Sequence, residues 1–137
     1  MDKALNYLAL ARKAGLVELG EEPVGAATRA LHGALVIVAK DASNHTWRRA
    51  NSFVAGTDQQ CLSVPFTKDE LGISIGRKEL AIAAFPDPAL ALAFVKALGE
   101  PEKHKYTLEA LETRAQRLRQ RQKEAKAHQR NLRRGKK

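Results

Sequence analysis

The sequence predicts an α/β domain with helices on both faces of a small, mixed or parallel sheet, followed by a basic helical arm. Two observations predict this architecture. Short apolar, β-branched segments alternate along residues 1–99 with segments whose apolar residues recur at helical spacing. Residues 1–99 carry 11 Lys+Arg and 10 Asp+Glu, whereas residues 100–137 carry 13 Lys+Arg and 5 Asp+Glu, so +8 of the net charge of +9 lies in the second segment. We therefore divide the chain into a domain, residues 1–99, and an arm, residues 100–137.

The first third of the domain is expected to contain two helices separated by a short strand. Asp2 can cap the first helix, and Gly15 is expected to end it. A strand is expected at residues 17–19. Proline is favoured in the first helical position, so we expect the second helix to begin at Glu22-Pro23 and to continue to Gly33.

The middle of the domain begins with residues 35–39 (Leu-Val-Ile-Val-Ala), a run typical of a strand buried on both faces. In the polar loop that follows, Asp41 and Ser43 either cap the next helix or line a ligand loop at the carboxyl end of the strand. That third helix contains Trp47 and ends at Gly56. We expect Trp47 in the core, and stacking on a nucleic-acid base is the alternative.

The last part of the domain contains two further strands and two helices. Residues 61–65 are expected to form a second core strand, and Thr67 with Glu70 matches the capping box of a short helix that ends near residues 72–76. The remaining elements are an apolar strand at residues 80–85 and a helix that starts at Asp87-Pro88 and closes at Gly99.

The arm is expected to form a polar linker at residues 100–106 and a helix capped by Thr107. Apolar residues recur at three-four spacing through Leu108, Leu111, Ala115 and Leu118 and then fade into Gln and Ala, which predicts a helix docked by its first turns and free at its basic end. The alternative is a solvated helix that only keeps the protein soluble.

Concentrated positive charge on the arm favours a polyanion, because binding displaces counterions from nucleic acid. We therefore expect that removal of residues 100–137 weakens RNA binding and flattens its salt dependence. The cations expected to contact phosphate are Arg114, Arg117, Arg119, Arg121, Lys123, Lys126, Arg130, Arg133 and Arg134.

The composition argues against several other classes of protein. A single cysteine, Cys61, excludes an intramolecular disulfide and suits a reducing compartment. The N-terminus lacks the pattern of a signal peptide, and no run approaches the roughly 20 apolar residues that span a bilayer. The four histidines have no ligand spacing with one another or with Cys61, so we expect no metal or cofactor. We expect a cytoplasmic monomer without membrane contact.

Residues 72–76 (Gly-Ile-Ser-Ile-Gly) match the G-x-S-x-G pattern of a hydrolase nucleophile elbow. That elbow needs a strand before the serine and a helix after it, and the order expected here is the reverse. The same glycines with Arg77-Lys78 imitate a phosphate loop, but the spacing is one residue short and no Ser or Thr follows the lysine. We therefore expect no enzymatic activity.

An ordered set of segments runs through the domain: residues 11–15 (Ala-Arg-Lys-Ala-Gly), Gly20 opening a helix, residues 35–43, residues 64–66 (Val-Pro-Phe) and residues 70–77. This set resembles the kink-turn-binding ribosomal protein superfamily over residues 3–98, and the arm lies outside the resemblance. The resemblance implies a three-layer α-β-α sandwich with a four-stranded mixed sheet, and RNA binding without catalysis.

In relatives that bind kink-turns, the helix opened by this glycine presents an Asn, then a Glu, and then a Lys three residues on. The matching positions here are Glu22, Pro23 and Ala26, so all three depart from the pattern. Glu21 and Glu22 compete with phosphate for the positive end of the helix dipole, and Pro23 removes an amide donor. The resemblance therefore implies weakened kink-turn recognition, although Glu22 can still accept hydrogen bonds from guanine.

The resemblance also implies one RNA-facing edge, formed by the helix start and the loop of residues 64–68. Its residues are Gly20, Glu21, Glu22, Val64, Pro65, Phe66, Thr67 and Lys68, with Arg12, Lys13 and Arg29 as further phosphate contacts. We expect a protein of the translation machinery, with structured ribosomal RNA and ribosomal proteins as partners. The alternative is a protein-interaction adaptor, in which an acidic edge of Glu18, Glu21 and Glu22 binds a basic partner and the arm is a tether.

Overall fold

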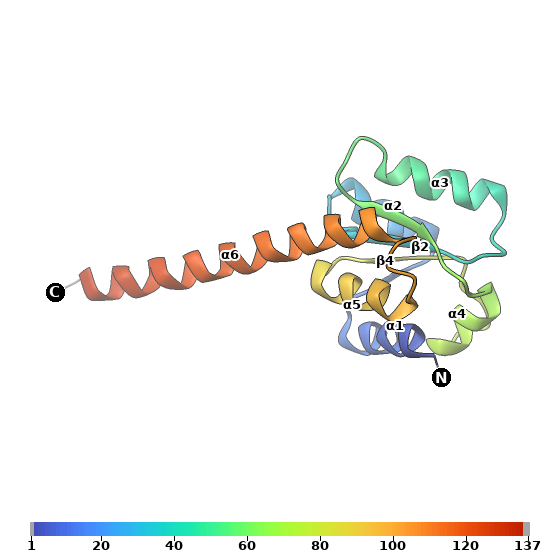
Figure 1. Ribbon diagram of the computed structural model, residues 1–137, viewed down its shortest axis with the longest axis horizontal. Coiled ribbons are helices and arrows are strands. Elements are labelled where there is room, and N and C mark those ends of the chain that lie inside the picture. The colour runs from blue at the N-terminus through green and yellow to red at the C-terminus, as the bar shows by residue number, and fades with distance from the viewer. Residues whose placement is uncertain (1, 136–137) are drawn as a thin grey trace.

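The computed structural model describes the backbone of residues 2–135 and the side chains of residues 2–132, and helices alternate with strands through this part of the chain (Figure 1). In chain order the elements are α1 (Lys3–Ala14), β1 (Glu18–Leu19), α2 (Glu21–Arg29), β2 (Leu35–Val38), α3 (Asn44–Val54), β3 (Gln60–Ser63), α4 (Lys68–Ser74), β4 (Ile82–Phe85), α5 (Pro88–Leu98) and α6 (Lys105–Gly135). The predicted α/β class is confirmed.

The four strands form one mixed sheet in the order β1-β4-β2-β3. β2 pairs in parallel with β3, and β4 runs antiparallel to both β1 and β2. Every residue of β2 and β4 is buried, as expected of central strands covered on both faces. The strand expected at residues 61–65 is present as β3, but it lies at an edge and is only partly buried, so the expectation of a second core strand is wrong. Of these five residues only Val64, which follows the strand, is buried.

Alternate residues of the central strands face two helical layers. Leu35 and Ile37 of β2 belong to a core cluster with residues of α1, α4, α5 and α6, whereas Val36 and Val38 belong to a second cluster with residues of α2 and α3. This division follows from the two-residue period of a strand. The predicted three-layer α-β-α sandwich is therefore confirmed.

The predicted caps of α1 and α4 are present. The Asp2 carboxylate accepts a hydrogen bond from the Ala4 N–H at 2.8 Å, and Gly15 ends α1 in the left-handed conformation. Thr67 and Glu70 form both hydrogen bonds of a capping box at the start of α4. These local signals fix the helix ends as the sequence predicts.

The boundaries of α2 differ from the prediction. The helix begins directly after Gly20, which is its N-cap, so Pro23 is its third residue and not its first. It ends at Arg29, four residues before the expected Gly33. Leu31 adopts φ 62°, and this left-handed backbone does not continue a right-handed helix.

The start of α6 also differs from the prediction. The helix begins at Lys105, so Thr107 lies inside its first turn and does not cap it. The Thr107 side chain is buried, and its hydroxyl donates to the Gln60 side-chain carbonyl at 3.4 Å. His104 is buried as well, whereas the other residues of the predicted linker, 100–103, 105 and 106, are exposed.

The first turns of α6 dock on the domain, as the apolar spacing predicts. Leu111 and Ala115 are each 1% exposed, and Leu111 belongs to the core cluster shared with α5. All residues from 116 to 132 are exposed, and the helix projects away from the domain (Figure 1). The packed part of the chain therefore extends through Ala115. No helix within residues 2–135 has the length and apolar character needed to cross a bilayer.

Candidate nucleic-acid interface

The sheet topology brings the two predicted RNA-facing segments to the same end of the domain. β1, β2 and β3 run in one direction, and we call the edge where they finish the carboxyl end. The Gly20 N–H, after β1, donates to the Ile82 carbonyl at 3.0 Å. The Val64 N–H, after β3, donates to the carbonyl of Val38, the residue paired with Ile82, at 2.9 Å. The helix start and the 64–68 loop therefore both lie at the carboxyl end.

The start of α2 carries acidic side chains and few free amide donors. Gly20 has φ 97°, and its backbone N–H is already used in the sheet. Glu21 forms an ion pair with Arg49 of α3, while Glu22 and Pro23 are exposed. Since Pro23 has no N–H, only two free amides remain in the first turn, beside two carboxylates. This helix start is poorly suited to phosphate.

The loop of residues 64–68 is held by its own core contacts and caps. Val64 and Phe66 are buried, whereas Pro65 is exposed. The Lys68 backbone N–H donates to the Asp41 carboxylate at 2.8 Å, which links this loop to the loop after β2. Asp41 therefore does not cap α3. Ser43 performs that role by accepting the Thr46 N–H at 3.2 Å.

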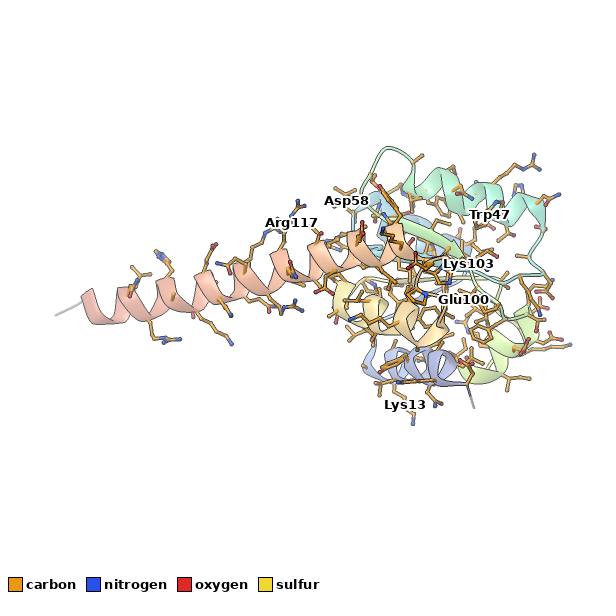
Figure 2. All side chains as sticks on the ribbon, viewed as in Figure 1. Lys13, Trp47, Asp58, Glu100, Lys103 and Arg117 are labelled. Atoms are coloured by element: carbon orange, nitrogen blue, oxygen red, sulfur yellow. The ribbon has the colours of Figure 1, made fainter. Side chains whose placement is uncertain are left out.

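Trp47 is not a core residue. Its side chain is 38% exposed on α3, so the expectation of burial is wrong. Its exposed indole surface leaves the alternative of contact with a nucleic-acid base open. Figure 2 labels Trp47 on α3, on the side of the molecule away from the free part of α6.

The remaining predicted cations of the domain lie at the opposite edge of the sheet, which we call the amino end. Arg12 and Lys13 occupy the last turn of α1, just before β1 begins, and Arg29 occupies the last turn of α2, just before β2 begins. The structure therefore separates these three residues from Gly20 and the 64–68 loop. The predicted set of site residues falls into two groups at opposite ends.

The arm begins beside the end of β3, where Glu100, Lys103 and His104 share a hollow with Ser63 and Val64, and its docked turns then reach the amino end. Arg114 donates through Nη2 to the Leu31 carbonyl at 2.9 Å and lies 3.8 Å from the Asp58 carboxylate. Arg119 pairs with Glu112 of the same helix at 3.8 Å. The cations of α6 that have no ion-pair partner within the described side chains are Lys105, Arg117, Arg121, Lys123, Lys126 and Arg130. Arg133 and Arg134 lie on the helix, but their side chains fall outside the described residues.

Sequence reasoning missed the residues that fix the arm in place. Leu31, Asp58 and Arg114 meet although they are distant in sequence, and the Leu31 contact joins residues 83 positions apart. Every residue has a backbone carbonyl, so the sequence does not reveal that the carbonyl of Leu31 binds Arg114. The apolar spacing of residues 108–118 indicates that the first turns dock, but it does not identify the residues they contact.

Two groups in the domain could suggest nucleophilic chemistry, Ser74 and Cys61. Ser74 lies in the last turn of α4 and its hydroxyl donates to the Leu71 carbonyl at 2.7 Å, so the serine of the G-x-S-x-G pattern is not at a strand-to-helix elbow. Burial raises the pKa of the Cys61 thiol from 9.0 to about 12. The thiol therefore stays protonated near neutral pH, and only the thiolate is a strong nucleophile.

The fold has counterparts among solved structures. A protein of unknown function from Bacillus halodurans superposes with a TM-score of 0.67 at 26% identity, covering 72% of this chain and 98% of its own. A 15.5 kDa RNA-binding protein from Giardia lamblia superposes with a TM-score of 0.53 at 18% identity, covering 78% of this chain and 85% of its own. No protein-family model matches the chain, and no curated protein matches it.

Proposed function

We propose that this chain is a non-catalytic RNA-binding protein whose affinity comes mainly from phosphate contacts of α6. One observation carries the proposal: +8 of the net charge of +9 belongs to residues 100–137, and residues 116–132 of this helix are exposed. Such a helix gains free energy by displacing counterions from a polyanion. The Giardia protein of similar fold, which is described as RNA-binding, supports RNA as that polyanion.

We further propose that the domain is a bacterial homologue of the kink-turn-binding ribosomal superfamily, associated with the translation machinery and with weakened kink-turn specificity. The α-β-α sandwich and the common position of Gly20 and the 64–68 loop support this relationship. The weakening follows from the helix start, where Glu22 is exposed and Pro23 lacks an N–H. Structured ribosomal RNA and ribosomal proteins are the partners that this assignment implies.

The electrostatic part of the proposal is tested with a chain that ends after Gln122. This truncation keeps the packed turns of α6, whereas removal of residues 100–137 would also remove the buried Leu111 and Ala115. Residues 123–137 contain seven Lys+Arg and one Glu, a net of +6. Binding of a structured ribosomal RNA fragment is measured by fluorescence anisotropy over a range of salt concentrations.

We expect the logarithmic salt slope of the truncated chain to be shallower by about 3 to 5, since each neutralised phosphate contributes a slope of up to ~0.9. Equal slopes for the two chains, with thermal unfolding of the domain unchanged, would contradict the role of the arm. Circular dichroism of the truncated chain serves as the folding control.

The specificity is tested with two RNAs, a kink-turn and the same sequence with its tandem G·A pairs replaced. We expect dissociation constants that differ by less than about tenfold, or ~1.4 kcal/mol, because phosphate contacts carry no sequence information. A preference of two orders of magnitude would show that the carboxyl end recognises kink-turns despite Glu22 and Pro23.

The adaptor alternative has a weaker basis. Its acidic edge loses part of its charge, because Arg49 pairs with Glu21. Crosslinking in cells separates the two functions, since RNA recovered at α6 supports the proposal and crosslinks to protein alone support the adaptor.

A further inference from the structure

Two adjoining hollows lie along the root of α6 and form one groove. The first, of about 260 Å³, and the second, of about 440 Å³, share Asp58, Arg114 and Arg117 in their linings. One wall is α6, and the other is formed by the α3–β3 loop, the turn after α2 and, in the second hollow, Pro86 and Pro88 at the start of α5. Figure 2 labels Asp58 and Arg117, which belong to these two walls. We call this the α6 groove and define it by His32, Asp58, Tyr106, Arg114, Arg117 and Arg121.

The walls of the α6 groove are anchored to each other. Leu31 has φ 62°, a conformation that costs roughly 1–2 kcal/mol for a residue with a side chain, and its carbonyl accepts a hydrogen bond from Arg114 at 2.9 Å. Arg114 also lies 3.8 Å from Asp58 of the α3–β3 loop. A single side chain of α6 thus holds two elements of the opposite wall, and the groove exists before any ligand arrives.

The groove has a different chemistry at each of its two ends. Tyr106 lies at one end with its side chain 77% exposed, beside the carboxylates of Asp58 and Glu109. Arg121 lies at the other end, and Arg117, one helical turn before it, lines the stretch that the two hollows share; both side chains are exposed. An aromatic ring with neighbouring carboxylates suits a neutral base, whereas a pair of guanidinium groups suits phosphates.

The dimensions of the groove fit a short stretch of an unpaired strand. Tyr106 and Arg121 are about 22 Å apart along the axis of α6, calculated from the rise of a helix. Successive nucleotides can therefore place a base at Tyr106 and phosphates at Arg117 and Arg121. A paired strand has its bases stacked inside the duplex and cannot offer one to a protein aromatic ring.

We propose that the α6 groove is a binding site for single-stranded RNA, with a base stacked on Tyr106 and phosphates held by Arg117 and Arg121. The inference rests on the proposed function, because it takes RNA as the ligand. It adds a defined binding groove to the sequence-independent phosphate contacts of the arm. The groove adjoins the amino end of the sheet, whereas Gly20 and the 64–68 loop lie at the carboxyl end. The chain can therefore contact two RNA segments at once.

The test compares two full-length variants with the same loss of charge. Arg117→Gln with Arg121→Gln alters the groove, and Lys126→Gln with Arg130→Gln alters the free part of α6. The probes are a labelled oligouridine of about ten nucleotides, within the usual site sizes of single-strand binders, and an RNA duplex of equal length. All four substituted residues are exposed, so thermal unfolding should be unchanged.

We expect the groove variant to lose on the order of tenfold more affinity for oligouridine than the matched variant, and to lose duplex binding no more than the matched variant does. Tyr106→Ala should weaken oligouridine binding by about tenfold, and Tyr106→Phe should retain it, because stacking needs the ring and not the hydroxyl.

Three outcomes would overturn the proposal. Equal losses in the two charge variants would show that the groove is not a site, and an equal loss of duplex binding would show that it does not select a single strand. Unchanged affinity of Tyr106→Ala for oligouridine would show that no base stacks on Tyr106. Failure of the unaltered protein to bind any RNA would instead refute the proposed function itself.

Discussion

Substitution of Leu111 tests whether α6 is packed on the domain. Its side chain is 1% exposed and belongs to the main core cluster together with Leu92 and Val95 of α5. Replacement of Leu111 by alanine removes apolar contacts and leaves a cavity between α5 and α6. Because the position of Arg114 depends on the same docked turns, this substitution also tests the geometry of the α6 groove.

The magnitude follows from the burial of the side chain. Leu→Ala substitutions at buried positions cost about 2–5 kcal/mol, since the lost transfer free energy and the cavity both contribute. With the site between two helices that can partly close together, we expect a loss of about 3 kcal/mol in the free energy of unfolding. For a chain of 137 residues, this corresponds to a decrease of roughly 10 °C in Tm.

The assay is urea unfolding followed by the fluorescence of Trp47, which is the only tryptophan in the chain. Leu132→Ala is the matched control, because Leu132 lies on the same helix with its side chain 52% exposed, and it should change the free energy of unfolding by less than about 0.5 kcal/mol. If Leu111→Ala were as mild as Leu132→Ala, α6 would not be packed on the domain, and the reasoning about the groove would fail with it.

Three other predictions concern the domain. Gly72→Ala should lower the free energy of unfolding by about 1–3 kcal/mol in urea titrations, because the added Cβ would lie 2.5 Å from the backbone of Glu79. Thr67→Ala should cost about 1 kcal/mol by the same measurement, because it removes one half of the capping box; no change would show that the cap does not stabilise α4. Cys61 should resist alkylation in the native state below pH 9 and react once urea unfolds the chain. Because partial burial raises its pKa to about 12, the stability that the protonated thiol contributes is complete below pH 9 and is lost as the pH rises toward 12. Equal alkylation rates in native and unfolded protein would contradict this prediction.

The fold was predictable where the determining signals are local. Asp2, Gly15 and Ser43 act within their own helix ends, and the apolar run of residues 35–39 contains the buried strand β2. The errors arise where distant contacts decide. The end of α2 depends on the backbone of Leu31, whose carbonyl anchors Arg114 from far along the chain.

The candidate site was predictable in its charge but not in its position. Counting residues is enough to locate the basic segment at Arg114 and beyond. The strand order β1-β4-β2-β3 is needed to learn that Arg12, Lys13 and Arg29 lie at the opposite end from Gly20. That order is set by pairing between strands far apart in sequence, which no local pattern reveals.

The exposed part of α6 is long enough to contact a ligand before the domain does. Residues 116–135 extend about 30 Å at the rise of a helix, which exceeds the ~13 Å radius of gyration of a domain of 100 residues. Salt screens exposed charges beyond about 8 Å at physiological ionic strength, so the charges at the end of α6 are too far from the domain to interact with its charges. On the proposed function, the tip would contact a polyanion first and hold the domain nearby at a raised effective concentration. The helix tip would then raise the frequency of encounters with the polyanion.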